Sequence, residues 1–211
     1  MAVDFKKTQN ELYRPGAKPS VIEVPEMVFI MVDGRGDPNT DALYQTALEI
    51  LYGLSYAVKM SKMSGAQPEG YYDFVVPPLE GLWSTDTGEF EIGAAEKSAF
   101  RWTSMIRTPE FVTPEVFDAA KVSLAKKKPT LDLSAARLES FDEGLCAQVM
   151  HTGPYDSEPA TISDLKKFIA DSGYKTDLSD KRRHHEIYLS DPRKTSPEKL
   201  KTIIRYPIAG K

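Results

Sequence analysis

The order of predicted strands and helices in this chain occurs twice, and this internal repeat limits the folds that the chain can adopt. Each half shows two strand-like runs, a turn with glycine and proline, an amphipathic helix and two further strands. The strands of the first half are predicted at 21–24, 27–32, 71–76 and 99–107. Those of the second half are predicted near 136–140, 145–151, Glu186 and 202–206. The pattern predicts an α+β fold of tandem β-α-β-β repeats.

Two such halves can pack about an approximate two-fold axis, which gives the fold pseudo-two-fold symmetry. Gly36 and Gly153 would occupy equivalent turns, and Asp73 and Glu186 would fall in equivalent strands. Ligand sites are common at junctions of this kind, so we expect a ligand cleft between the halves. The alternative is two ordinary α+β layers that share no cleft.

One domain over 1–211 is predicted, because the chain is long enough to bury a single core. Thr113-Pro114 is typical of a helix start, with a cap followed by proline in the first turn. The predicted parts are a polar N-terminal arm at 1–20, a first half at 21–112, a connecting helix at 113–130 and a second half at 131–211. Leu12 and Tyr13 are expected to hold the arm on the surface.

The helix of the first half is expected to begin near a cap at Asn39 or Thr40. Its predicted apolar face consists of Leu43, Ala47, Ile50, Leu54 and Val58. In the second half the corresponding face carries Ile162, Leu165 and Ile169.

Charge and composition exclude several classes of protein. The net charge is -4 and the pI is about 5.5, which argues against a nucleic-acid partner. No apolar stretch approaches the roughly 20 residues that cross a bilayer, and the first residues do not resemble a signal peptide. The only cysteine is Cys146, which has no partner for an intramolecular disulfide. We therefore expect a cytoplasmic protein that binds neither nucleic acid nor membrane.

The strand that begins at His184 is the strongest candidate for a functional site. Side chains alternate along a strand, so Ile187 and Leu189 would face a core while His184, Glu186 and Tyr188 share the other side. A half-buried carboxylate such as Glu186 is costly unless it is paired. Glu186 could bind a cationic ligand, act as a base on water, or pair with His184, Arg101 or Arg205.

Aromatic residues occur near predicted strand ends and turns rather than on helix core faces. They are Trp83, Trp102, Tyr13, Tyr71, Tyr155 and Tyr188. Such rings stack on flat ligands and attract cations, although core packing is the ordinary role of each one. Asp73, beside Tyr71, is a second candidate carboxylate for the same pocket.

No metal or cofactor is predicted. His184 and His185 are adjacent, so on a strand they point to opposite faces, and His151 is the only other histidine. The Gly34-Arg35-Gly36 turn lacks the third glycine of a dinucleotide-binding motif.

Several motifs of the chain resemble those of the GyrI-like small-molecule-binding proteins in their stand-alone form. These motifs are 24–27, 33–39, 78–83, 148–155 and 185–192. The resemblance implies tandem β-α-β-β units, a cleft between them and an acidic residue, here Glu186, that faces bound drugs. Related transcription regulators carry a helix-turn-helix domain, for which the arm is too short and too rich in proline.

The chain is most similar to a stand-alone subfamily of hydrolases that open the cyclopropyl ring of cyclopropanoid DNA-alkylating compounds. This resemblance implies that Trp83, Trp102, Tyr155 and Tyr188 sandwich a flat substrate. Glu186 would deprotonate the attacking water, and Tyr188 or Tyr13 would donate a hydrogen bond to the dienone oxygen.

Two alternatives come from other classes of protein. The first is a protein that sequesters flat or cationic xenobiotics without altering them. The second is an inhibitor that docks on a larger enzyme such as DNA gyrase, but nothing in the sequence marks a docking face. A small molecule is therefore the expected partner, and a partner protein is not.

Overall fold

One antiparallel sheet of nine strands organises the computed structural model, which describes residues 2–85 and 97–211. The strands follow the order β1-β6-β9-β8-β3-β4-β2-β5, and β7 pairs with β9. The strands are β1 Ser20–Val24, β2 Met27–Arg35, β3 Leu79–Thr85, β4 Phe100–Arg107, β5 Ala136–Phe141, β6 Gly144–Thr152, β7 Tyr174–Thr176, β8 His184–Tyr188 and β9 Lys201–Gly210. The α helices are α1 Phe5–Thr8, α2 Asn10–Tyr13, α3 Ala42–Lys59, α4 Pro114–Lys127 and α5 Glu158–Asp171. Short 3-10 turns are η1 Met60–Ser64, η2 Lys97–Ala99, η3 Tyr155–Ser157 and η4 Pro197–Lys199.

The predicted tandem repeat is present. Strands β2, β4 and β3 lie side by side in the first half, as β6, β9 and β8 do in the second. The halves join where β3 pairs with β8, with Gly81 opposite Glu186. In addition, the leading strand of each half crosses to the other, because β1 pairs with β6 and β5 pairs with β2. This reciprocal pairing is the pseudo-two-fold arrangement that the sequence pattern predicts.

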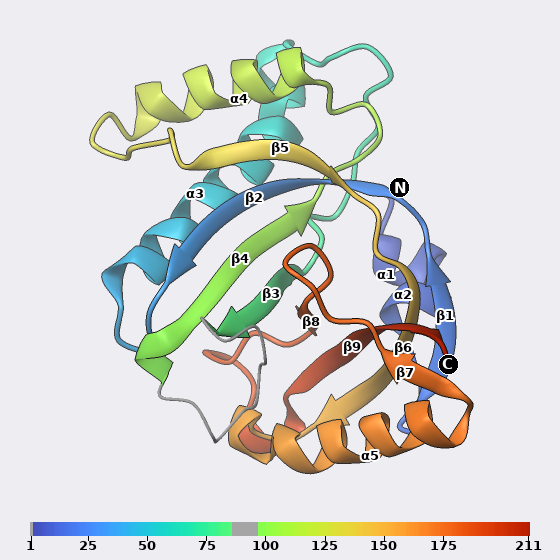
Figure 1. Ribbon diagram of the computed structural model, residues 1–211. Helices are drawn as coiled ribbons and strands as arrows, with labels where there is room; N and C mark the ends of the chain where they lie inside the picture. The colour runs from blue at the N-terminus through green and yellow to red at the C-terminus, as the bar shows by residue number, and fades with distance from the viewer. Residues whose placement is uncertain (1, 86–96) are drawn as a thin grey trace.

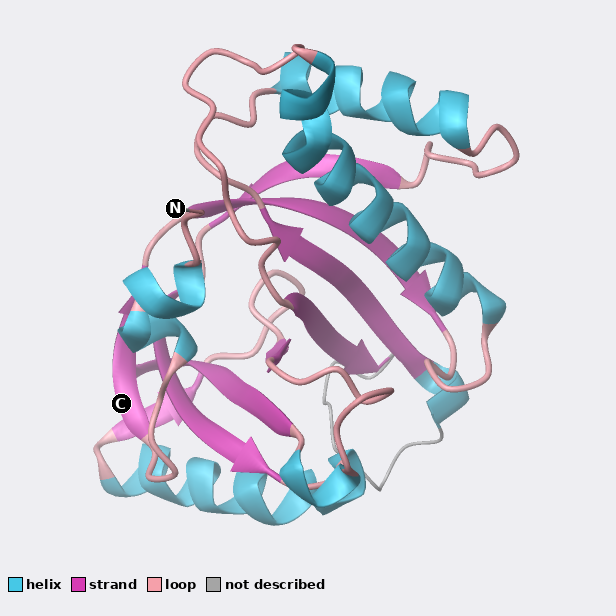
Figure 2. Cartoon of the chain, turned by 180° about the vertical axis from the view of Figure 1, so that it is seen from behind, coloured by secondary structure: helices cyan, strands magenta, loops and turns pink. Residues whose placement is uncertain are grey.

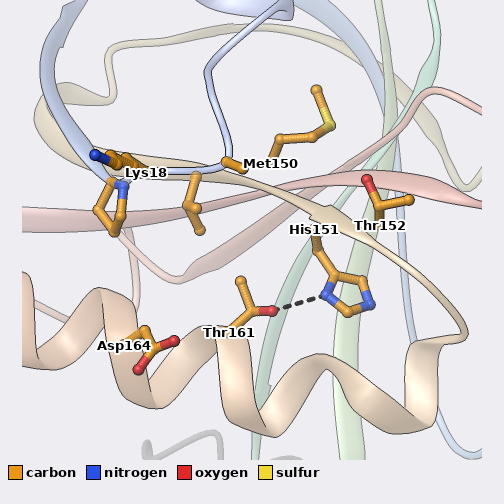
Figure 3. Close-up of a pocket in the computed structure, with 9 residues that line it drawn as sticks. Lys18, Met150, His151, Thr152, Thr161 and Asp164 are labelled. Atoms are coloured by element: carbon orange, nitrogen blue, oxygen red, sulfur yellow. Dashed lines mark hydrogen bonds between the residues drawn. The ribbon is translucent and has the colours of Figure 1, made fainter.

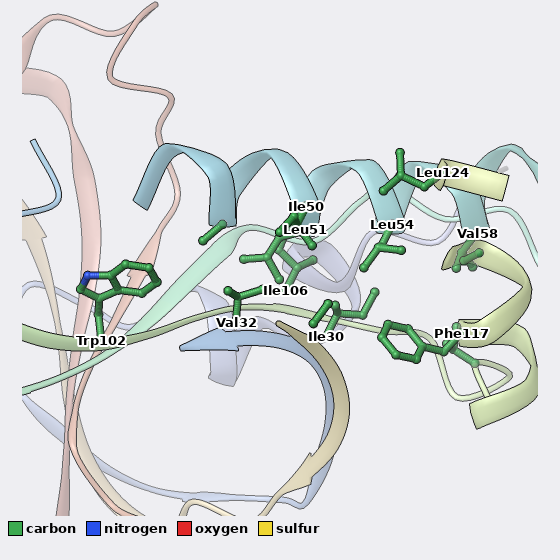
Figure 4. Close-up of a cluster of buried hydrophobic side chains, with 14 of the residues drawn as sticks. Ile30, Val32, Ile50, Leu51, Leu54, Val58, Trp102, Ile106, Phe117 and Leu124 are labelled. Carbon is green, nitrogen blue, oxygen red and sulfur yellow. The ribbon is translucent and has the colours of Figure 1, made fainter. Parts of the chain in front are cut away.

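The long helices cover one face of the sheet. Helix α3 packs on β2 and β4, whereas α5 packs on β6 and β9, and Figures 1 and 2 show the two helices over opposite ends of the sheet. The junction of β3 and β8 lies between these ends. The core beneath α3 is shown in Figure 4 and includes Ile30, Val32, Ile50, Leu51, Leu54 and Ile106. Two side chains of α4, Phe117 and Leu124, complete this core at the right of Figure 4.

The opposite face of the sheet is covered by the N-terminal arm. Leu12 and Tyr13 are buried there, as predicted, together with Phe5. Their neighbours on the sheet are Met105 and Ile187. The connecting helix also begins as predicted, since the Thr113 side chain accepts a hydrogen bond from the Val116 amide.

The predicted strand at 71–76 is wrong. Only Phe74 makes an isolated bridge there, to Val3, and the strand that pairs with β8 is β3, which begins at Leu79. Strand β3 is buried along nearly its whole length, as a strand paired on both edges must be. Prolines 77 and 78 separate the two segments, and proline cannot donate a hydrogen bond to a central ladder.

The apolar face of α3 also differs from the predicted one at its first residue. Leu43 is 62% exposed, whereas Tyr44 is buried. Tyr44, Ala47, Leu51, Leu54 and Val58 follow the alternating three-and-four spacing of a helix face, and Leu43 does not.

Candidate functional site

Strand β8 places Glu186 at the centre of the sheet, on the face that carries α3 and α5. The side chain is only 5% exposed. Its Oε1 lies 2.8 Å from His184 Nε2, and its Oε2 accepts a hydrogen bond of 2.7 Å from the Tyr188 hydroxyl. All three residues lie on one face of β8, as the alternation predicts. Of the pairings that the sequence left open, His184 is therefore the partner, while Arg205 lies on the opposite face and binds Glu143.

Trp83 of β3 extends this network across the strand pair. Its indole Nε1 donates a hydrogen bond of 2.9 Å to the Tyr188 hydroxyl. The indole can reach the Tyr188 hydroxyl because Gly81, whose Cα lies beside this contact, has no side chain. A Cβ atom at Gly81 would lie 2.7 Å from Trp83 Nε1 and 3.3 Å from the Tyr188 hydroxyl. A chain of donors thus runs from Trp83 through Tyr188 to Glu186.

Aromatic rings surround this chain of donors. The Tyr155 and Tyr188 rings meet edge to face at 5.9 Å. Tyr44, from the first turn of α3, lies 6.1 Å from the Trp83 ring and 5.0 Å from the Trp102 ring. The structure therefore brings together five of the predicted residues with Glu186, namely Trp83, Trp102, Tyr155, His184 and Tyr188.

Burial keeps the tyrosines of this cluster protonated. Burial first, and then the negative charge of Glu186, raises the pKa of Tyr188 well above its usual range. Burial raises the pKa of Tyr155 to about 12, with smaller contributions from the charges of Glu158 and Glu186. The pKa of Tyr44 is raised as well, chiefly by burial. These phenols can therefore act as hydrogen-bond donors at neutral pH.

The sequence interpretation missed a second carboxyl group, Glu158, at the start of α5. It is 1% exposed, and burial first, then the negative charge of Glu186, raises its pKa to about 10. A signal was present in the sequence, because Glu158 precedes Ile162 by four residues and so falls on the apolar face of α5. Tyr44 was missed as well, although it lies on the buried face of α3.

Tyr13, although predicted for this site, lies on the other face of the sheet. Its hydroxyl donates to Glu80 Oε1 at 3.4 Å, within a separate buried network. There His185 lies 3.0 Å from Glu80 Oε2 and 2.9 Å from Glu143 Oε1, while Arg205 donates to Glu143 Oε2 at 2.9 Å. Since adjacent strand residues point to opposite faces, His184 and His185 serve different networks.

Tyr71 and Asp73 are also placed elsewhere. Asp73 forms ion pairs with Lys62 at 2.9 Å and with Lys59 at 3.4 Å, beyond the C-terminal end of α3. The Tyr71 hydroxyl donates to the Lys59 carbonyl, and its ring contacts Phe111. Because 71–76 is not the strand opposite β8, neither residue joins Glu186.

A surface pocket of about 540 Å³ lies between the arm and α5. Lys18, His151 and Asp164 line it (Figure 3). His151 Nδ1 lies 2.8 Å from the Thr161 hydroxyl, and its Nε2 lies 3.3 Å from the Ser157 hydroxyl. His151 thus supports the η3 turn that carries Tyr155, while the pocket itself does not contain Glu186.

Among residues 2–85 and 97–211, no group of three His, Cys, Asp or Glu side chains is arranged to hold a metal ion. Within the same ranges, none of the helices combines the length and apolar character that a membrane span requires.

An internally repeated α+β fold, with an acidic and aromatic site at the junction of its halves, defines a class of small-molecule-binding domain. The GyrI-like small molecule binding domain matches residues 17–209, and the chain belongs to this family. No protein of curated function matches the chain.

Three solved structures from Listeria innocua are similar over nearly the whole chain. An uncharacterized conserved protein is 48% identical with a TM-score of 0.93, and the match covers 98% of this chain and 100% of that one. A hydrolase is 47% identical with a TM-score of 0.89 and the same coverage. A further hydrolase is 46% identical with a TM-score of 0.90, over 99% of this chain and 100% of that one.

Proposed function

We propose that this protein binds flat aromatic or cationic xenobiotics at the Glu186 site and hydrolyses the cyclopropyl ring of cyclopropanoid DNA-alkylating compounds. The observation that carries the proposal is the Glu186 carboxylate itself. It is buried among aromatic rings, and its Oε2 accepts from the Tyr188 hydroxyl at 2.7 Å. The two similar hydrolases, at 47% and 46% identity, support a hydrolytic activity.

The reaction adds one water molecule to a spiro-cyclopropyl dienone. The water oxygen forms a bond to a cyclopropane methylene carbon, and the bond from that carbon to the spiro carbon breaks. The released electron pair moves into the ring, which becomes an aromatic phenolate. Glu186 accepts the proton that the water loses, and a general base of this kind typically contributes about 10² to 10⁴ in rate.

Tyr188 is the proposed donor to the dienone oxygen: when the ligand binds, its single hydroxyl proton turns from Glu186 Oε2 to the substrate, and Oε2 then accepts from the attacking water. Its raised pKa keeps the phenol protonated, so the hydroxyl can stabilise negative charge as it develops on the substrate. Tyr13 cannot take this role, because its hydroxyl lies in the Glu80 network on the other face. Trp83, which donates to the Tyr188 hydroxyl at 2.9 Å, orients it.

Access to Glu186 requires movement of side chains, since the carboxylate is 5% exposed. Tyr155 is half-buried and belongs to the short η3 turn. We infer that a flat ligand displaces Tyr155 from its edge-to-face contact with Tyr188 and stacks in its place.

The test is incubation of the protein with a synthetic spiro-cyclopropyl dienone in water enriched in ¹⁸O, followed by mass spectrometry. We expect a water adduct that carries the label in the wild type and in Glu198→Gln, an exposed control. Glu186→Gln should lose most of the activity while it remains folded. Full turnover by that variant would remove Glu186 from the mechanism.

The second candidate function is sequestration without chemistry, because the same site can bind a ligand and leave it intact. Recovery of unchanged compound bound tightly to wild-type protein would favour sequestration over hydrolysis. Either function would protect a cytoplasm from DNA-alkylating compounds, with the small molecule as the only partner required.

A further inference from the structure

Tyr155 is held differently from the other aromatic residues around Glu186. Those residues lie on strands or on α3, whereas Tyr155 lies on the three-residue turn η3. Its side chain is half-buried, and its ring meets the Tyr188 ring edge to face at 5.9 Å. The contacts that fix η3 therefore decide where Tyr155 lies over the site.

The chain bends sharply at Gly153 as it leaves β6 for η3. The φ angle of Gly153 is 143°, which favours glycine. A Cβ atom there would lie 3.0 Å from the Ser157 hydroxyl and 3.4 Å from His151 Nε2. Both side chains are thus packed against the start of the turn, and we call residues 153–157 the gate turn.

His151 of β6 joins the gate turn to α5. Its Nδ1 lies 2.8 Å from the Thr161 hydroxyl on α5 (Figure 3). Its Nε2 lies 3.3 Å from the Pro154 carbonyl oxygen and 3.3 Å from the Ser157 hydroxyl. A carbonyl oxygen only accepts, so in the neutral ring Nε2 carries the proton and Nδ1 accepts from Thr161. The shorter bond anchors the ring to α5, and the two longer contacts hold the gate turn.

Ser157 takes part in the same contact instead of capping α5. Its hydroxyl donates to the Pro154 carbonyl at 2.7 Å, and its amide donates to the same oxygen at 2.9 Å. It stands at the N-cap of α5, where serine ordinarily accepts from a helix amide, yet in the described part of the chain its side chain makes no capping bond. Release of Pro154 would free this hydroxyl to cap α5, so the gate turn has a second favourable arrangement.

We propose that His151 is a positioning residue, which holds the gate turn closed and so keeps Tyr155 against Tyr188 until a ligand enters. In the open arrangement Ser157 caps α5, while the bond between His151 and Thr161 persists. The kind of ligand that enters rests on the proposed function, but the two arrangements of the gate turn do not.

A gate of this kind makes a prediction that a merely structural histidine does not. A ligand binds only to the open fraction of the protein, so a closed gate lowers the apparent affinity. A variant with a loosened gate should therefore bind faster than the wild type. General damage to the site would weaken or slow binding instead.

Amide hydrogen exchange, followed by NMR, tests the gate without any ligand. The amide of asparagine can occupy the place of Nδ1, so His151→Asn can keep the bond to Thr161 but cannot reach the Pro154 carbonyl. We expect the Ser157 amide to exchange roughly tenfold faster in this variant, the effect of one ordinary hydrogen bond. Amides of β6 and β9 should keep their wild-type rates.

Two further variants are controls for this measurement. The longer side chain of glutamine reaches the place of Nε2, so His151→Gln should restore slow exchange at Ser157. Thr152→Ala, at an exposed neighbouring position, should leave it unchanged. Wild-type exchange at Ser157 in His151→Asn would overturn the proposal, and so would faster exchange throughout β6 and β9, since His151 would then have a purely structural role.

Stopped-flow binding of ethidium, a flat aromatic cation, tests the gate from the ligand side. We expect roughly tenfold faster association with His151→Asn and with Ser157→Gly than with the wild type, and a smaller change in dissociation. Ser157 is exposed and glycine is tolerated at an N-cap, so Ser157→Gly keeps the test valid if His151→Asn fails to fold. Association that is equal or slower in the folded variants would overturn the gate.

The gate and the proposed function can fail separately. Faster exchange at Ser157 in His151→Asn, in a protein that neither binds ethidium nor hydrolyses the dienone, would leave the gate intact and remove the function. Turnover that depends on Glu186, with exchange at Ser157 that is indifferent to His151→Asn, would do the reverse.

Discussion

Trp83 and Tyr188 lie 105 residues apart in the sequence, and the indole Nε1 of the first donates a hydrogen bond of 2.9 Å to the hydroxyl of the second. The pairing of β3 with β8 creates this contact, because it aligns one central strand from each half. The hydroxyl then donates to Glu186 Oε2. The candidate site is thus shared between the halves, and neither half contains it alone.

Removal of the Tyr188 hydroxyl should impair the chemistry more than the fold. For Tyr188→Phe we expect turnover of the dienone to fall about 10²- to 10³-fold, the usual cost of losing one donor to a developing oxyanion. Tyr13→Phe is the matched control, since its hydroxyl lies on the opposite face. Equal turnover by the two variants would contradict the role given to Tyr188.

Gly81 should be intolerant of a side chain. In Gly81→Ala the new Cβ would lie 2.7 Å from Trp83 Nε1, so the indole must move away from Tyr188. We expect ligand affinity, measured by quenching of tryptophan fluorescence, to fall about tenfold, an effect of about 1.4 kcal/mol. Gly210→Ala, where a Cβ meets nothing within 4 Å, should bind normally.

The buried network behind the site should limit stability at both extremes of pH. Burial alone would lower the pKa of His185, but the charges of Glu143 and Glu80 outweigh it and raise the pKa from 6.5 to about 9. A raised histidine pKa stabilises the folded state fully below pH 6.5 and ceases to do so as pH rises through about 9.

Glu143 acts in the opposite direction. Burial opposes its charge, yet His185 and Arg205 lower its pKa from 4.5 to about 2. Its contribution is complete above pH 4.5 and is lost as pH falls toward 2. The free energy of unfolding that these two groups contribute should therefore be greatest between pH 4.5 and 6.5, and urea unfolding at a series of pH values measures it. In His185→Gln the fall of the free energy of unfolding between pH 6.5 and about 9 should be smaller than in the wild type. An unchanged fall would show that His185 is not charged in the folded state.

The assignment of the buried face of α3 can be tested by replacing two leucines, one on this face and one off it. Leu54 is 0% exposed, and Leu54→Ala should lower the free energy of unfolding by about 2 to 5 kcal/mol. Leu43 is 62% exposed, and Leu43→Ala should change it by less than about 0.5 kcal/mol. Chemical denaturation measures both. A similar loss for the two variants would place Leu43 in the core after all.

Local patterns in the sequence were sufficient for much of the fold. The Thr113 cap predicted the start of α4, and alternation along β8 predicted that His184, Glu186 and Tyr188 share a face. These features depend on backbone geometry within a few residues, which neighbouring side chains largely decide.

Predictions that needed partners distant in the sequence were less successful. The segment 71–76 resembles a strand, but β3 at Leu79–Thr85 is the segment that pairs with both β4 and β8. Tyr13 and Tyr71 are aromatic residues like Tyr155, and only the packing of whole elements separates them from the site. Glu158 required the further knowledge that the start of α5 lies over Glu186.

The sequence by itself determined the repeat, the strand faces and the acidic residue at the centre, because periodicity and alternation are properties of one segment at a time. The tertiary structure alone decided which aromatic residues surround Glu186 and that a second carboxyl group, Glu158, is buried within reach of its charge. The physical reason is that strand register and helix docking are set by burial over the whole sheet, so a shift in one pairing moves a side chain to another face or another neighbour.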